Sequence, residues 1–293
     1  MEYLFTEQML LCYAYISISL WSEAFFYVSL QKYKELCKFI KIIAEIFLSI
    51  MYNKEYCVKK GVLIKQMNDF GYHFWTLMPR LWDGAAITIK ITAIAVCVGM
   101  VIGMVMALSK LSSIWPLRII SNVYIECLRG TPLYVQILLF HFGVPGLMNS
   151  LDGVSGFYFD VMTTAIVVCS LNSGAYIAEI FRSGIQSIDR GQMEAARSLG
   201  MSHTKAMKYI ILPQAVKRVI PPLCNEFIVL LKDTSLLAVI GVTEILKTGQ
   251  IYITTTYAPF PAYIGVACVY LILTFTISRV VNYIEVKWNM SSK

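Results

Sequence analysis

The feature that most constrains the fold of this chain is a series of long apolar segments separated by short polar connections. Five segments stand out: residues 84–108, 120–142, 157–181, a stretch that starts near 210, and 263–284. A helix needs roughly 20 mainly apolar residues to cross a bilayer, and a helix satisfies its own backbone hydrogen bonds in lipid. The sequence therefore predicts an all-α, polytopic membrane protein with a core of five transmembrane helices.

Composition and charge agree with a membrane protein. Hydrophobic residues make up 57% of the chain and charged residues 15%, whereas a soluble domain has about 25% charged residues. The net charge of +7 comes from basic residues between apolar segments and not from one patch, so we expect no nucleic-acid partner. The eight cysteines and three histidines are scattered without ligand spacing. We therefore expect no metal, no cofactor and no catalytic site.

The basic residues also predict an orientation. The connection after the third segment is rich in them: Arg182, Arg190, Arg197, Lys205, Lys208, Lys217 and Arg218. Residues 143–160 contain no lysine or arginine. Because short cytoplasmic loops are enriched in lysine and arginine, this connection and the C-terminus are expected in the cytoplasm. The N-terminal end of the first segment is then expected outside.

The fourth segment is irregular. Pro213, Pro221 and Pro222 interrupt it, and Lys232 and Asp233 lie near its far end. A proline in a membrane helix requires neighbouring groups that satisfy the freed carbonyls. The pattern predicts a broken helix, which would either border a pathway or be a packing kink.

Residues 1–66 do not fit this scheme. They contain one apolar stretch, residues 9–30, and a shorter one with charges, residues 39–51. The second has about a dozen residues, fewer than the roughly 17 that a spanning helix requires. Residues 1–66 are either an extension with extra membrane segments or a mis-assigned start, with translation beginning at Met67, and we favour the second interpretation. Residues 67–293 form the predicted transmembrane domain.

A short polar segment, Glu194-Ala195-Ala196-Arg197-Ser198-Leu199-Gly200, is followed after nine residues by Ile210-Ile211-Leu212-Pro213. Asp189 can cap a helix here with Gln192 three residues on, and Gly200 is suited to end it. We expect a Glu194–Arg197 pair and an apolar face of Ala195, Ala196 and Leu199. A helix this short needs packing partners to be stable. It is either a docking element for a second protein or an ordinary surface helix.

Other segments accompany this one in the same order: 129–133 with Gln136, 172–176 with Glu179 and Arg182, and 231–246. Together they resemble the permease subunits of binding-protein-dependent, ATP-binding-cassette importers of polar amino acids (the His/Glu/Gln/Arg/opine type), in which the short segment is the EAA loop. The resemblance covers residues 84–286. It implies a bacterial inner-membrane (plasma-membrane) subunit that forms the translocation pathway for a polar amino acid.

The resemblance also implies partners and site residues. The partners are a cytoplasmic cassette ATPase dimer, a second permease (identical or homologous) and an extracellular or periplasmic solute-binding protein. The EAA loop, at about residues 189–213, implies these ATPase-coupling residues: Glu194, Ala195, Ala196, Leu199, Gly200, Leu212 and Pro213. The chain contains no GxxxxGK[ST] phosphate loop, so we expect ATP hydrolysis on a separate chain.

Polar groups inside the predicted spans are candidates for the pathway, because zwitterionic ligands need donors and acceptors. These are Gln136, Asn172, Asn225, Lys232 and Asp233. We expect two charged pairs, Glu126 with Arg129 and Glu179 with Arg182, that neutralise one another. Gly99 and Gly103 form a GxxxG pair that predicts close helix packing. An ion-coupled secondary transporter or channel is the alternative function, but it would not require a docking helix.

Overall fold

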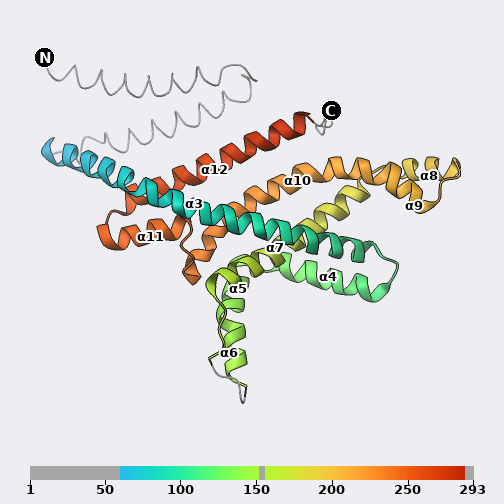
Figure 1. Cartoon of the computed structure of the whole chain (residues 1–293), viewed down its shortest axis with the longest axis horizontal. Coiled ribbons are helices and arrows are strands. Elements are labelled where there is room, and N and C mark those ends of the chain that lie inside the picture. The colour runs from blue at the N-terminus through green and yellow to red at the C-terminus, as the bar shows by residue number, and fades with distance from the viewer. Residues whose placement is uncertain (1–59, 152–155, 288–293) are drawn as a thin grey trace. The chain divides into compact units, whose positions relative to one another are not determined.

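A computed structural model describes residues 60–151 and 156–287. The chain divides into two units, Met1–Met67 and Asn68–Lys293. The alternatives for the N-terminal extension concern residues that lie almost entirely outside the described part of the chain. The second unit contains the predicted spans (Figure 1).

The elements of the described residues are helices, and no strand occurs among them. The α-helices are α3 (Lys60–Leu111), α4 (Trp115–Gly130), α5 (Leu133–Leu138), α6 (Val144–Asn149), α7 (Val161–Gln186), α8 (Arg190–Ser198), α9 (His203–Ala206), α10 (Leu212–Asp233), α11 (Ile245–Thr256) and α12 (Pro259–Lys287). Two π-helical turns, η1 (Leu139–Gly143) and η2 (Met207–Ile211), and a 3₁₀ helix, η3 (Thr234–Ile240), join some of them. Helices α3, α7 and α12 are long and apolar enough to cross a membrane, and the bent pair formed by α4 and residues 133–149 is a fourth candidate. The prediction of an all-α, polytopic membrane protein is confirmed.

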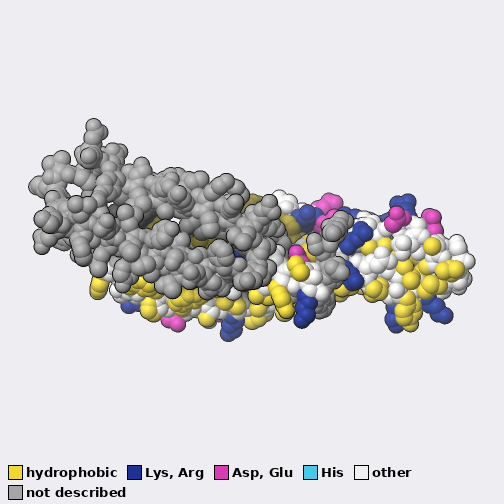
Figure 2. All heavy atoms as spheres, turned by 90° about the horizontal axis from the view of Figure 1, so that it is seen from above, with side chains coloured by type: hydrophobic (Ala, Val, Ile, Leu, Met, Phe, Trp, Pro, Cys, Tyr) yellow, Lys and Arg dark blue, Asp and Glu magenta, His cyan; other side chains and the backbone are white. Residues whose placement is uncertain are grey.

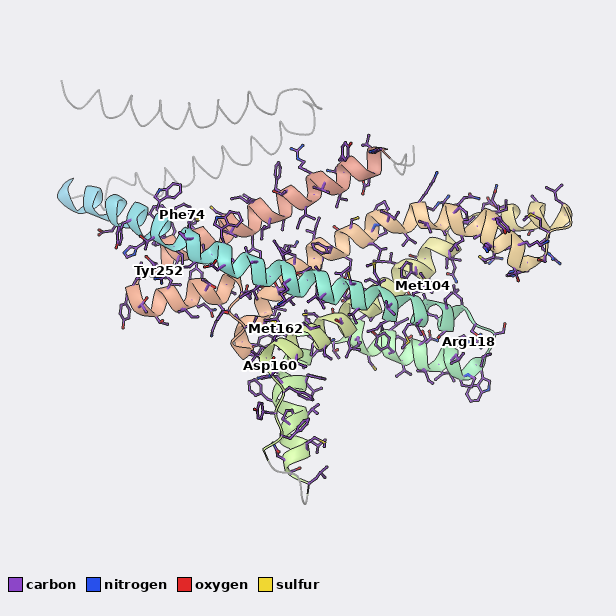
Figure 3. All side chains as sticks on the ribbon, in the orientation of Figure 1. Phe74, Met104, Arg118, Asp160, Met162 and Tyr252 are labelled. Carbon is purple, nitrogen blue, oxygen red and sulfur yellow. The ribbon has the colours of Figure 1, made fainter. Side chains whose placement is uncertain are left out.

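The helices run between two distinct ends of the bundle. Figure 1 shows α8 and α9 at one end, beside the C-terminal end of α7 and the start of α10, with α11 toward the other end. In Figure 3, Phe74 and Tyr252 lie near the α11 end and Arg118 lies toward the α8 end. Figure 2 shows several lysine and arginine side chains toward the α8 end. We call this the basic end, because α8, α9 and η2 carry Arg190, Arg197, Lys205 and Lys208.

The second predicted span, residues 120–142, is not one straight helix. Helix α4 ends at Gly130, and the helical axis bends by 105° before it continues at Leu133. Pro132 lacks an N–H and forces the preceding residue out of the helical region, so Thr131 is extended (φ −116°, ψ 143°). The amide of Gln136 donates to the Leu128 and Thr131 carbonyls at 2.8 and 3.0 Å. Gln136 thus satisfies backbone groups that the break would leave without partners.

The fourth predicted span is broken at a different place from the one that we expected. Helix α10 continues through Pro221 and Pro222, and Pro213 lies in its first turn, directly after the π-helical turn η2. The change of geometry comes after Asp233, where the 3₁₀ helix η3 begins and Gly241 ends it at φ +90°. Helix α10 also contains Lys217 and Arg218, so its composition is less apolar than that of the other spans. Helix α11, after η3, was not predicted.

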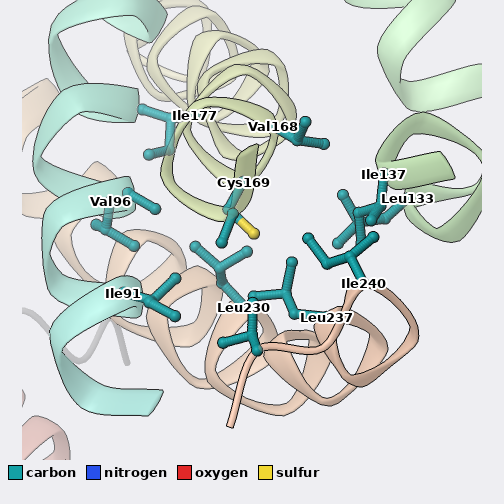
Figure 4. Close-up of a cluster of buried hydrophobic side chains, with 13 residues drawn as sticks. Ile91, Val96, Leu133, Ile137, Val168, Cys169, Ile177, Leu230, Leu237 and Ile240 are labelled. Atoms are coloured by element: carbon teal, nitrogen blue, oxygen red, sulfur yellow. The ribbon is translucent and has the colours of Figure 1, made fainter. Parts of the chain in front are cut away.

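Helices α3 and α7 approach one another closely at three glycines. A Cβ atom added at Gly99 would lie 3.2 Å from the Gly174 nitrogen, and one added at Gly103 would lie 2.9 Å from the Gly174 oxygen. Such backbone contact is what small residues allow. The largest apolar cluster packs beside this seam, with Ile91, Cys169 and Leu230 fully or almost fully buried (Figure 4). The GxxxG prediction is confirmed.

Candidate coupling site and membrane pathway

The predicted EAA helix is present as α8, and both of its ends are capped. The Asp189 carboxylate accepts a hydrogen bond from the Gly191 N–H at 2.6 Å. At the other end Gly200 has φ +83°. Its N–H donates to the Arg197 carbonyl at 3.0 Å, and the Met201 N–H donates to the Ala196 carbonyl at 3.1 Å. This pair of bonds is the Schellman pattern that glycine favours.

The chain then turns back into the bundle through a continuous helical path. The Ser202 hydroxyl accepts from the Lys205 N–H at 3.3 Å and begins α9. The π-helical turn η2 follows, and α10 begins directly after it with Leu212 and Pro213. Helices α8 and α9 contact one another, and α8 also contacts η2. Residues 190–213 therefore form a compact helical hairpin at the basic end.

The apolar residues of α8 do not form the single face that we expected. Ala196 is 5% exposed and faces the protein itself, whereas Leu199 is 84% exposed and Ala195 lies on the exposed side. The reason is geometric, because residues 195 and 199 are four apart on a helix and residue 196 is turned by about 100°. Leu212 and Pro213 are also exposed. The hairpin thus presents an apolar Leu199 to its surroundings.

Three further predictions concern pairs of charged side chains. Arg197 donates to the Met201 carbonyl at 3.0 Å, so it supports the C-terminal cap of α8 and does not form the expected pair with Glu194. Arg182 and Glu179 do form the expected pair. Glu126 does not pair with Arg129, because the Arg129 guanidinium lies over the Tyr176 ring at 5.3 Å.

The hairpin is attached firmly to the ends of α7 and α10. The Arg218 guanidinium of α10 donates to the Ser187 carbonyl, just after α7. Gly184 of α7 lies directly against Val219 of α10. An apolar cluster built on three buried residues joins the same pieces: Ile188, Ile211 and Ala215. The hairpin, the end of α7 and the start of α10 are therefore one packed body.

The pathway candidates are separated into two groups by the structure. Gln136 and Asn172 come together, and the Asn172 amide donates to Gln136 Oε1 at 3.0 Å. Asn225 and Lys232 are exposed on α10, and Asp233 is partly buried at its end. The Gln136 amide already donates to backbone carbonyls at the break between α4 and α5. This structural role accounts for its position without a role in the pathway.

One buried carboxylate near these residues was missed. Glu226 of α10 is 9% exposed and lies beside the Ser173 hydroxyl, within electrostatic reach of Arg129 and Asp233. The Ser173 hydroxyl is fully buried and completes no hydrogen bond in the described part of the chain. The sequence could have pointed to Glu226, because an ionisable residue in the middle of a predicted span usually has a function.

Residues 60–151 and 156–287 bring no three His, Cys, Asp or Glu residues together. His141 instead shares a hydrogen bond with Thr164 at 2.9 Å, and His73 one with Tyr252 at 2.8 Å.

The described residues form a polytopic helical bundle with a capped hairpin at its basic end, and this arrangement is that of a membrane permease. A family described as the inner membrane component of binding-protein-dependent transport systems matches residues 99–289. The chain belongs to this family. It is a multi-pass protein of the bacterial inner membrane and a transport subunit.

Individual relatives agree with this assignment. The chain is 37% identical over 211 residues to the glutamine transport system permease protein GlnP of Escherichia coli K12, covering 72% of this chain and 94% of GlnP. It is 36% identical over 210 residues to the arginine transport system permease protein ArtQ of Bacillus subtilis, covering 72% of this chain and 93% of ArtQ.

Solved structures show the same fold. A crystal structure of an amino acid ABC transporter with histidines matches with a TM-score of 0.67 at 41% identity, covering 71% of this chain and 94% of that chain. The MetNI methionine ABC transporter in inward-facing conformations matches with a TM-score of 0.55 at 17% identity, covering 74% and 97%. At that identity the second match supports the fold alone.

Proposed function

We propose that this chain is the permease subunit of an ATP-driven importer of a polar amino acid. The observation that carries the proposal is the hairpin at residues 190–213, which combines two capped helix ends with a fully presented Leu199. A rigid apolar projection at the basic end is suited to a protein partner. The relatives named for glutamine and arginine transport support the class of substrate.

The coupling residues are those of this hairpin. Leu199 and Ala195 would enter a groove on a cytoplasmic ATPase, and Glu194 would border the contact. Ala196 would pack α8 against the rest of the protein, and Gly200 would end the helix. Leu212 and Pro213 would complete the exposed surface at the start of α10. ATP hydrolysis would take place on that partner, which would be a dimer. The dimer would move two hairpins, one from this chain and one from a second permease that is identical or homologous to it.

The polar cluster inside the bundle is the proposed pathway. Glu226, Ser173 and Asn172 offer a carboxylate, a hydroxyl and an amide on α7 and α10. A zwitterionic amino acid needs an anionic partner for its ammonium and donors for its carboxylate. Arg129, on α4, supplies a positive charge close to the same cluster.

Uptake by a defined complex tests this function. The full chain would be reconstituted in proteoliposomes with its cognate ATPase, its solute-binding protein and, where the transporter has one, its second permease. We expect uptake of radiolabelled glutamine, arginine, histidine or glutamate that requires ATP and the binding protein. Uptake driven by a sodium or proton gradient without ATP would instead favour a secondary transporter.

Orientation is tested by labelling from one side. We propose that the hairpin and the C-terminus face the cytoplasm, because the basic residues gather there. In a variant lacking native cysteines, Ser150→Cys should react with an impermeant thiol reagent added outside, and Thr204→Cys should not. Both positions are exposed, so accessibility within the protein is matched. The reverse pattern would place the hairpin outside and exclude a cytoplasmic ATPase contact.

A further inference from the structure

Glu179 joins two helices at the basic end of the bundle. Its carboxylate accepts from Lys110 Nζ of α3 at 3.3 Å and from Arg182 Nε of α7 at 2.9 Å. The side chains of Lys110, Glu179 and Arg182 are 23, 22 and 26% exposed. Arg182 also contacts Gln186 in the last turn of α7. One carboxylate is thus shared between a cation of its own helix and a cation of the neighbouring helix.

The two cations would respond differently to a movement of the hairpin. Arg182 is three residues after Glu179 on the same helix, so it moves with the carboxylate. Lys110 is held by a single, longer contact from the last turn of α3. Any displacement of α7 relative to α3 at this end would therefore break the contact with Lys110 and leave the contact with Arg182 intact.

The close contact between α3 and α7 at Gly99, Gly103 and Gly174, here called the glycine seam, determines where such a displacement can occur. At Gly103 the two helices approach so closely that an added Cβ atom would lie 2.9 Å from the Gly174 oxygen and 2.7 Å from Ile177 Cγ2, so the helices cannot slide freely there. Lys110 lies seven residues further along α3, about 10 Å at 1.5 Å per residue. A rotation of roughly 10° about the seam would move the ends apart by about 2 Å, enough to open the Lys110 contact.

We propose that Glu179 is a positioning residue for coupling. Its ion pair with Lys110, here called the latch, would be a releasable contact between α3 and the packed body formed by the hairpin, the end of α7 and the start of α10. The end of α7 belongs to that body through Ser187, Arg218 and the Gly184–Val219 contact. In the described conformation the latch holds the hairpin against α3. When an ATPase displaces the hairpin, the latch opens and Arg182 keeps the Glu179 charge neutralised. This inference rests on the proposed function.

Charge removal at Lys110 tests the latch in the complete complex. Lys110→Gln should raise the ATPase rate measured without binding protein by about 1.5- to fivefold, since partly exposed ion pairs stabilise one state by such factors. It should also lower the number of amino acids imported per ATP hydrolysed. Lys110→Arg should restore both values toward those of the unaltered chain. The difference between the unaltered chain and Lys110→Gln should shrink at high salt, because salt screens ion pairs.

Arg118→Gln is the matched control, since it removes one positive charge from the same end, on the exposed first turn of α4. It should leave both values unchanged. All rates are expressed per assembled complex. The unaltered complex must first show uptake that depends on the binding protein, and this requirement tests the proposed function separately from the latch. The latch is rejected if Lys110→Gln matches the unaltered complex in basal rate and coupling ratio, or if Arg118→Gln has the same effect. Glu179→Gln, which removes the charge from the acceptor, must show at least the effect of Lys110→Gln.

Discussion

Replacing Gly200 by valine is expected to abolish uptake while the subunit still inserts into the membrane. Gly200 has φ +83°, and a Cβ atom added there would meet no other atom within 4 Å, so the effect is conformational and not a clash. A β-branched residue strongly resists positive φ, at a cost of about 1–3 kcal/mol. Helix α8 has nine residues and depends on its caps. We therefore expect the hairpin to lose its shape and its partner.

The measurements are co-purification of the ATPase with the permease and uptake in proteoliposomes. Gly200→Asn should retain most of both, because asparagine tolerates the left-handed region, and Gly200→Ala should be intermediate. Gly146→Val is the matched control: Gly146 also has open space around it and lies in α6, away from the hairpin. Normal ATPase binding and uptake by Gly200→Val would remove the hairpin from the coupling mechanism.

Neutralising Glu226 is the second change with a large expected effect. Glu226→Gln keeps the shape of the side chain and removes its charge, and a hydrogen bond to a charged group contributes about 1.5–3 kcal/mol. We expect uptake to fall by about 10- to 100-fold, with ATPase binding unchanged. Glu226→Asp should recover part of the uptake because it restores the charge.

Glu285→Gln makes the same chemical change at a partly exposed site near the end of α12. It should leave uptake unchanged. The comparison is made at saturating binding protein, so that a slower delivery of substrate does not enter the result. If Glu226→Gln imports as fast as the unaltered chain, the buried carboxylate has no part in the pathway.

The features that the sequence predicted well are those determined locally. The two caps of α8 depend on Asp189 and Gly200 and on residues within a few positions of them, so the pattern predicted both ends. The expected capping box with Gln192 is wrong, because Asp189 accepts from the Gly191 N–H and Gln192 Oε1 accepts from Gln214 Nε2 at 3.4 Å. The GxxxG pair predicted the close approach of α3 and α7 in a similar way, because only small residues allow two helix backbones to touch. The apolar stretches predicted α3, α7 and α12 as spans for the same reason, since length and hydropathy decide membrane insertion.

The features that were missed depend on groups distant in the sequence. Pro132 occurs inside an apolar run, and the 105° bend is stable because the Gln136 side chain returns to satisfy the carbonyls. Pro221 and Pro222 suggested a break, yet α10 continues through them because its packing against α7 and α12 holds it. The sequence analysis chose Asn225 as a pathway residue and missed its neighbour Glu226. The structure distinguishes the two, because Glu226 is buried and Asn225 is exposed.

The π-helical turn at Met207–Ile211 has a consequence for how this family of chains can vary. A π turn contains about one residue more than an α turn, and it lies between the hairpin and α10. Deleting one residue here would restore an α turn and rotate α8 and α9 by about 100° around the α10 axis. Leu199 would then point in another direction although every residue of the hairpin was unchanged. The spacing between the hairpin and Pro213 therefore sets the direction of Leu199, and a change of length there would redirect the contact surface as a whole.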